Sequence, residues 1–171
     1  RKEAKERGID PDRLVFAPRI AVDEHLARHR VADLFLDTFT VNAHTTASDA
    51  LWAGLPVLTM PGRQFAARVG ASLVNAVGLP ELIAQNEAEY EKKALALAND
   101  LEALTSLRAK LTRKRLSSPL FDTRGFAADI ERGFDMIFER HLQGLPPAHL
   151  DIPAKIDTPQ SRSGGKVNAA A

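Results

Sequence analysis

The chain has 171 residues, 44% of them hydrophobic and 26% charged, and it carries a net charge of +1 at neutral pH. This composition suits a globular domain with its own core, and the small net charge gives no reason to expect a nucleic acid or an anionic membrane as partner. Because it has no cysteine, the sequence excludes disulfides and cysteine-ligated metals, and we expect a reducing, cytoplasmic setting. No apolar run approaches the ~20 residues of a membrane span, and we expect no signal peptide.

In the first half of the sequence, short apolar runs alternate with polar segments typical of helices. Residues 1–8 are typical of the last turns of a helix that stops at Gly8, so we expect a fragment that begins inside a helix. The apolar runs predict buried strands, each followed by a helix. We expect strands at 14–16, 34–36 and 56–59, and helices at 23–30, 46–53 and 64–77.

The second half is predicted to be mostly helical. We expect a short helical turn over residues 79–86 and two helices over residues 87–115, separated near Asn99 and Asp100. Asp122 is expected to cap a last helix that ends near Leu142. From residue 144 onward Pro, Gly, Ser and Ala dominate and the apolar periodicity is lost. We therefore expect one domain over residues 1–143 and a disordered tail over residues 144–171.

The alternation of strands and helices at short spacing predicts an α/β fold with a parallel sheet. A doubly wound sheet commonly has about six strands, whereas this sequence predicts three strands followed by helices. We interpret it as the second half of a doubly wound, Rossmann-like domain with C-terminal helices. In the usual strand order, residues 14–16 would pair with a strand that this sequence lacks, which would leave an exposed edge.

The stretch from Asn42 to Asp49 follows a predicted strand and opens a predicted helix. Thr46 is expected to cap this helix, with Asp49 three residues later closing a pair that resembles a capping box. Free N–H groups at a helix start favour an anion, and the Thr45 and Thr46 hydroxyls add donors for phosphate oxygens. Considered alone, the same residues fit an ordinary cap and a solvated loop histidine equally well.

A second polar segment, Ile20 to Arg28, also follows a predicted strand and opens a helix. His25 and Arg28 are three residues apart and share a helix face, where an imidazole could stack on a base and a guanidinium could offer planar donors. Considered alone, the segment fits a polar surface helix better. Together, the two strand-end segments could hold a base at one and a diphosphate at the other.

The run ADLFLDTFTVNAHTTASDALWAGLPVLTMPG, residues 32–62, resembles the donor-site region of protein O-GlcNAc transferases and their SPINDLY-like and bacterial relatives. The resemblance continues through residues 68–91 and 115–123. It depends on HTT…D followed by LWAG and P-x-x-T-M-P-G, a combination specific to this family. It implies the GT-B fold, in which two Rossmann-like domains hold the donor in their cleft behind TPR repeats. This chain would supply the C-terminal Rossmann-like domain from about its fourth strand onward.

The resemblance further implies a UDP-binding role for six residues, two near the uridine, three at the diphosphate and one at the ribose hydroxyls. In that order they are His25 and Arg28, then His44, Thr45 and Thr46, and finally Asp49. The family often has Lys at the position of Val22, so one donor contact is expected to be missing. The lysine that supports the leaving diphosphate and the proton-handling groups lie upstream in the family. We therefore assign no catalytic residue here and expect the chain to be inactive alone.

The implied reaction is inverting transfer of GlcNAc from UDP-GlcNAc to Ser or Thr hydroxyls of proteins, with no cofactor and no metal. No His, Asp or Glu cluster has the spacing of metal ligands. The implied partners are a nucleotide sugar, acceptor proteins, the upstream half of the catalytic domain and TPR repeats. The alternatives are a GDP-fucose protein O-fucosyltransferase of SPINDLY type, a UDP-sugar epimerase of the same fold and a non-catalytic nucleotide-binding fragment. The HTT…D…LWAG pattern argues against the epimerase, while the base and the sugar stay open.

Overall fold

The computed structural model describes residues 1–153, and the chain divides into two compact units, Arg1–Asp122 and Thr123–Ala171. Residues 154–171, which make up most of the predicted tail, lie outside the described residues. The first unit contains a small parallel sheet and most of the helices, and the second is built on one long helix. The sequence therefore folds into a helix-rich α/β structure.

The sheet consists of two short strands, β1 (Phe35–Leu36) and β2 (Val57–Leu58), which run parallel with Phe35 opposite Val57. On its other side β2 is followed by an isolated parallel bridge between Thr59 and Ile83. Alternate residues of the β2 segment hydrogen-bond to each neighbour, so β2 lies between β1 and the Ile83 segment. The predicted strands at 34–36 and 56–59 are thus confirmed, and the extended segment at Ile83 is an addition that the apolar pattern did not predict.

Helices connect and surround these strands in the first unit. They are α1 (Lys2–Glu6), α2 (Val22–Arg28), α3 (Thr45–Ala53), α4 (Val69–Ala76), α5 (Glu87–Ala98) and α6 (Leu101–Lys114). Gly8, Gly54 and Gly78 follow α1, α3 and α4 with positive φ of 74°, 87° and 74°, a conformation that glycine adopts without steric cost. The predicted break between α5 and α6 is confirmed, and Asp100 caps α6 by accepting a hydrogen bond from the Ala103 N–H at 2.9 Å.

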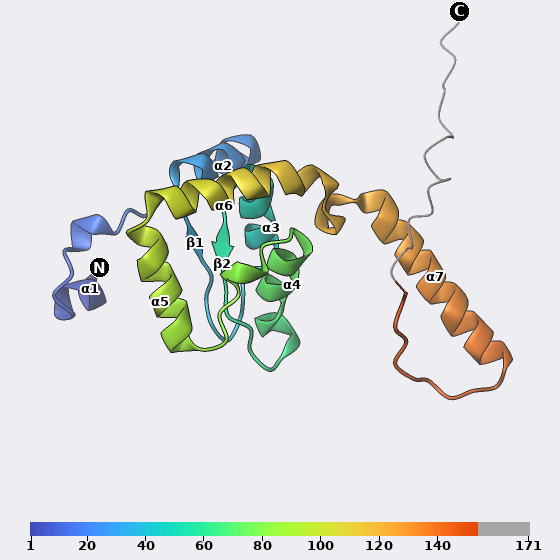
Figure 1. Cartoon of the computed structure of the whole chain (residues 1–171). Helices are drawn as coiled ribbons and strands as arrows, with labels where there is room; N and C mark the ends of the chain where they lie inside the picture. The colour runs from blue at the N-terminus through green and yellow to red at the C-terminus, as the bar shows by residue number, and fades with distance from the viewer. Residues whose placement is uncertain (154–171) are drawn as a thin grey trace, which may run out of the picture. The chain divides into compact units, whose positions relative to one another are not determined.

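The core of the first unit lies between the sheet and its helices (Figure 1). Both α3 and α5 contact β2, and α3 also contacts α4. The buried cluster draws its large side chains from α3, β2, α4, the turn after α4, and α6. They are Leu51, Val57, Val74, Val77, Leu79 and Leu111. Ala47, Ala50 and Leu51 of α3 belong to this cluster, so the buried face of α3 packs against the core.

Two predicted elements differ in the structure. The predicted strand at 14–16 is wrong, because this segment forms no strand and Val15 and Phe16 are 87% and 71% exposed. A strand requires a hydrogen-bonded neighbour and apolar cover, and no other part of residues 1–153 supplies them here. The predicted helix over 64–77 is divided at Arg68 into a short 3₁₀ turn, Phe65–Ala67, and α4.

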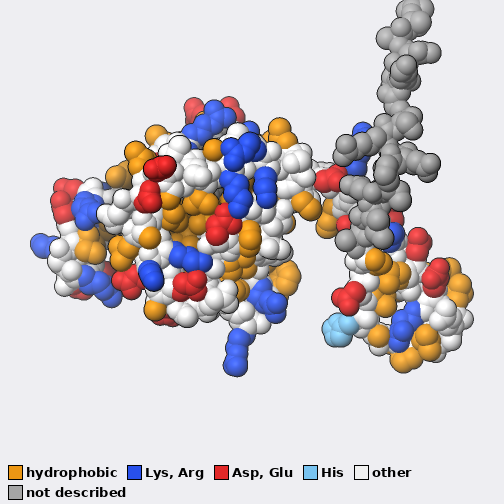
Figure 2. Space-filling model, in the orientation of Figure 1, with side chains coloured by type: hydrophobic (Ala, Val, Ile, Leu, Met, Phe, Trp, Pro, Cys, Tyr) orange, Lys and Arg blue, Asp and Glu red, His pale blue; other side chains and the backbone are white. Residues whose placement is uncertain are grey.

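The second unit contains α7 (Thr123–Leu142) and a return segment, residues 144–153, that runs back beside the helix (Figure 1). Arg140 Nε donates to the carbonyl oxygen of Pro146 at 2.6 Å, and Arg132 Nη2 donates to that of Pro153 at 3.1 Å. Apolar side chains are exposed on α7 (Figure 2), namely Phe126, Ile130, Phe134, Ile137 and Phe138. None of the helices in residues 1–153 has the length and apolar character needed to cross a membrane.

Candidate functional site

The first turn of α3 carries the predicted anion-binding residues. It follows the loop of residues 38–44, which begins where β1 ends. The N–H groups of the first turn of a helix have no acceptor within the helix, so those at Thr45 and Thr46 are free to bind a ligand. The Thr45 and Thr46 side chains are exposed, and neither makes a hydrogen bond to another described residue. The arrangement therefore presents both backbone and hydroxyl donors beyond the carboxyl end of a parallel strand.

The predicted cap of this helix is wrong by two residues. His44, with φ −102° and ψ −92°, is the N-cap residue, and its side chain does not cap the helix. Thr45 and Thr46 already belong to the first turn, so Thr46 cannot be the cap. Asp49 then lies five residues after His44, too far along the helix to close a capping box with it. The half-buried Asp49 carboxylate has no hydrogen-bond partner among residues 1–153.

His44 is held by a neighbouring turn. Its Nε2 lies 3.2 Å from the carbonyl oxygen of Ala66, and its ring meets Phe65 edge-on at 6.2 Å between centroids. The same Ala66 oxygen accepts a hydrogen bond from the Asn42 N–H at 2.8 Å. The imidazole thus has a defined orientation at the start of α3, with one nitrogen engaged by the protein.

His25 and Arg28 lie together on α2, as their spacing predicts. They line an open hollow of about 410 Å³ with the preceding segment, Ala17 to Ile20, and Val22. Arg28 Nη1 donates to the carbonyl oxygen of Pro18 at 2.8 Å, which fixes that segment to the helix. The hollow is within the size range of small-molecule sites, and α2 contacts α3. The two helices that carry the predicted binding segments are therefore in contact.

Asp37 is the residue of the site that sequence reasoning missed. It follows β1 and is 4% exposed. Its Oδ1 accepts hydrogen bonds from the N–H groups of Thr38 at 2.8 Å and Ala43 at 2.6 Å, and its Oδ2 accepts one from the Thr59 hydroxyl at 2.7 Å. A carboxylate with three donors is well compensated for its burial. The signal in the sequence was a polar residue directly after each of two apolar strands.

Tyr90 of α5 contacts the start of the same loop. Its hydroxyl donates to the carbonyl oxygen of Asp37 at 2.8 Å, and its ring packs edge-on against Phe39 with 4.9 Å between centroids. Burial, together with the nearby Asp37 carboxylate, raises the pKa of Tyr90 to about 12. The phenol therefore stays protonated and remains a donor at physiological pH.

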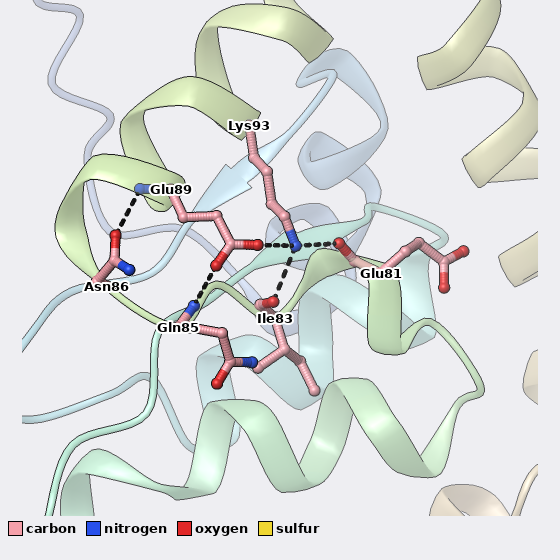
Figure 3. A network of polar contacts seen from close by, with 6 residues as sticks. All are labelled: Glu81, Ile83, Gln85, Asn86, Glu89 and Lys93. Atoms are coloured by element: carbon pink, nitrogen blue, oxygen red, sulfur yellow. Dashed lines mark hydrogen bonds and ion pairs between the residues drawn. The ribbon is translucent and has the colours of Figure 1, made fainter.

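The start of α5 is in turn fixed by the polar contacts around Lys93 (Figure 3). Lys93 Nζ donates to the carbonyl oxygens of Glu81 and Ile83 at 2.8 and 2.9 Å and lies 3.0 Å from Glu89 Oε1. Glu89 Oε2 accepts a hydrogen bond from the Gln85 N–H at 2.8 Å. The Gln85 N–H, together with Lys93, lowers the pKa of Glu89. These contacts join α5 to the Ile83 segment and so position Tyr90.

Comparison with known proteins shows the family to which this chain belongs. The sequence pattern of Glycosyl transferase family 41 matches residues 1–130. A UDP-N-acetylglucosamine–peptide N-acetylglucosaminyltransferase of Caenorhabditis elegans is 41% identical over 150 residues, which cover 88% of this chain and 13% of that protein. The probable enzyme SEC of Arabidopsis thaliana, with the same activity in its name, is 38% identical over 153 residues, or 89% of this chain and 16% of that protein.

A solved structure agrees with these relatives. A mutant O-GlcNAc transferase from Thermobaculum terrenum superposes with a TM-score of 0.79 at 32% sequence identity, covering 84% of this chain and 28% of that one. This chain spans only 13% of the length of the Caenorhabditis elegans relative and 16% of that of the Arabidopsis thaliana relative. In residues 1–153 no group of three or more His, Asp or Glu side chains is placed to hold a metal ion.

Proposed function

The chain belongs to glycosyl transferase family 41, and from this we propose that it forms the donor-binding part of a protein O-GlcNAc transferase. The parent protein would transfer GlcNAc from UDP-GlcNAc to Ser or Thr hydroxyls of acceptor proteins, with inversion. The names of its relatives in animals and plants support this substrate and this reaction. We also propose that the first unit is the second half of the C-terminal Rossmann-like domain of a GT-B enzyme, in keeping with the Thermobaculum terrenum structure.

The observation that carries the proposal is the exposed first turn of α3. Its N–H groups and the hydroxyls of Thr45 and Thr46 form a set of donors with no partner among residues 1–153. Such a set suits a diphosphate, because the positive end of the helix dipole adds to the hydrogen bonds. His25 and Arg28 line the hollow at α2, which would receive the uracil base of the uridine. The Asp49 carboxylate would accept hydrogen bonds from the ribose hydroxyls.

The proposed contribution to catalysis is stabilisation of the leaving group. When the bond between the sugar and UDP breaks, negative charge develops on the diphosphate. Donors that already point at this position stabilise the transition state without having to reorganise. We propose that no residue of this chain removes the proton from the acceptor hydroxyl. The catalytic groups that this chain lacks would come from the upstream part of the protein, and TPR repeats would contribute to acceptor binding. We propose that the reaction needs no cofactor and no metal, and that the protein is cytoplasmic.

The experiment that tests the proposal is a ligand comparison on the full-length parent. Calorimetry with UDP, GDP, UDP-GlcNAc and GDP-fucose would measure affinity, and transfer to a Ser- and Thr-containing acceptor protein would measure activity. We expect UDP and UDP-GlcNAc to bind and GlcNAc to appear on the acceptor. Preference for GDP and GDP-fucose would support the SPINDLY-type alternative instead. Absence of binding by all four ligands would contradict the proposal.

A further inference from the structure

The loop of residues 38–44 presents the first turn of α3, and a buried carboxylate determines its shape. We propose that Asp37 is a positioning residue for nucleotide binding, acting through this loop without touching the ligand. The inference rests on the proposed function, because it assumes that the start of α3 binds the nucleotide. Asp37 is itself 4% exposed, so a bound ligand would meet the loop and not the carboxylate.

A single oxygen of Asp37 joins the two ends of the loop. Oδ1 accepts from the Thr38 N–H at the beginning of the loop and from the Ala43 N–H directly before the N-cap residue His44. These two bonds, at 2.8 and 2.6 Å, are charge-assisted and therefore stronger than bonds between neutral groups. Without the carboxylate, both N–H groups would lose their acceptor, and the approach of the chain to α3 would no longer be fixed.

The carboxylate is prevented from turning by its other neighbours. Oδ2 accepts from the Thr59 hydroxyl at 2.7 Å, which comes from the end of β2. The backbone of α4 lies directly against the pair, because a Cβ on Gly70 would be 2.3 Å from Oδ2 and 2.6 Å from Thr59 Oγ1. Asp37 is thus held by two structural elements while it holds the loop.

The loop contains a strained residue that needs such support. Thr40 has φ of 71°, a left-handed conformation that is unfavourable for a β-branched side chain. Gln64 Nε2 donates to the carbonyl oxygen of Thr40 at 2.9 Å, and Asn42 Nδ2 donates to that of Thr38 at 2.9 Å. Strain of this kind persists only where the surroundings impose it, and it clusters at ligand-binding sites. A loop released from Asp37 would adopt other conformations, and the nucleotide would have to order it on binding.

The test compares substitutions of Asp37 in the full-length parent. Asp37→Ala is expected to raise the Kd of UDP by about ten- to a hundredfold, the scale of a misplaced binding group. The KM of the nucleotide-sugar donor should rise by a similar factor, with a smaller change in kcat at saturating donor. Asp37→Asn should recover much of the affinity lost in Asp37→Ala. Its amide oxygen can accept from the same two N–H groups, and its amide nitrogen can donate to the Thr59 hydroxyl oxygen.

A core variant separates positioning from general destabilisation. Leu111→Ala empties a fully buried position of α6 and should lower the melting temperature without changing the Kd of UDP. Equal losses of affinity in Leu111→Ala and Asp37→Ala would overturn the inference, as would normal UDP binding by Asp37→Ala. If Asp37→Ala does not fold, Thr59→Val takes its place, with an expected weakening of about two- to tenfold, and unchanged affinity would again overturn the inference. Failure of the unsubstituted parent to bind UDP would overturn the proposed function as well.

Discussion

The Thr59 hydroxyl donates a 2.7 Å hydrogen bond to Asp37 Oδ2 and so joins the residues that directly follow β2 and β1. Both side chains are almost completely buried. The carboxyl ends of the two strands are therefore connected by side chains as well as by the backbone. Asp37 also accepts two hydrogen bonds from the loop that leads to α3. Changes to the pair should therefore affect both stability and ligand binding.

Thr59→Val replaces the hydroxyl by a methyl group of similar size. Because the Asp37 oxygen would lose a donor in a buried environment, we expect the free energy of unfolding to fall by about 1–3 kcal/mol. Thr59→Ser keeps the hydroxyl and serves as the control, although it removes a methyl group. Chemical denaturation of both variants measures the difference. Equal stability of the valine and serine variants would show that the hydrogen bond contributes little.

Gly70→Ala tests how closely α4 packs on the same pair. The added Cβ would lie 2.3 Å from Asp37 Oδ2, closer than real contacts allow, so backbone or side chains must shift. We expect a loss of about 1–3 kcal/mol, the usual cost of overpacking. Gly133→Ala is a matched change inside α7, where the new Cβ would meet the tip of the Ile152 side chain. There the better helix propensity of alanine, worth up to about 1 kcal/mol, should offset most of the contact. Loss of stability in Gly133→Ala alone would contradict this account of Gly70.

Asp49 is expected to serve binding and not stability. The structure shows that it does not close a capping box, so Asp49→Asn should change the free energy of unfolding by no more than about 0.5 kcal/mol. If Asp49 accepts hydrogen bonds from the ribose, the same variant should weaken UDP binding. Thermal unfolding and UDP calorimetry on the parent protein give both quantities. A large loss of stability with normal UDP affinity would assign Asp49 a structural role.

The contacts of Glu89 predict a pH dependence of stability. Its pKa is lowered from the ordinary 4.5 by the Gln85 N–H and by Lys93. A carboxylate with a depressed pKa contributes stability that is present above its unfolded pKa and is lost as the pH falls through its folded pKa. Glu89→Gln should therefore reduce the loss of stability below pH 4.5. Denaturation curves at several pH values below 6 test this, and identical curves for the parent protein and Glu89→Gln would contradict it.

Much of the fold could be predicted from local patterns. The apolar runs that became β1 and β2 end at Asp37 and Thr59, and Gly54 and Gly78 mark the ends of α3 and α4. The segment around Ile83 was missed because Pro80 and the neighbouring turn obscure its extended conformation. The strand predicted at 14–16 was wrong because an apolar run predicts burial only where a neighbouring strand and a covering layer are available.

The sequence indicated the candidate binding residues but not the residues that support them. His25 and Arg28 line one hollow, and His44, Thr45 and Thr46 lie at the start of α3, while their role in UDP binding stays a prediction. The supporting residues were missed because their bonds join distant parts of the sequence. Thr59 and Tyr90 reach Asp37 from 22 and 53 residues away, and no local motif indicates such contacts.

UDP binding by the first turn of α3 is tested most directly by isothermal titration of the full-length parent and its Thr46→Ala variant. Loss of one charge-assisted hydrogen bond to the diphosphate should weaken binding by roughly 1.5–3 kcal/mol, about ten- to a hundredfold. His44→Ala should weaken binding as well. Thr105→Ala, which changes an exposed helical threonine of α6, is the control and should leave the affinity unchanged. Tight UDP binding that is the same in the parent and in the Thr46 and His44 variants would contradict the assignment of the site to α3.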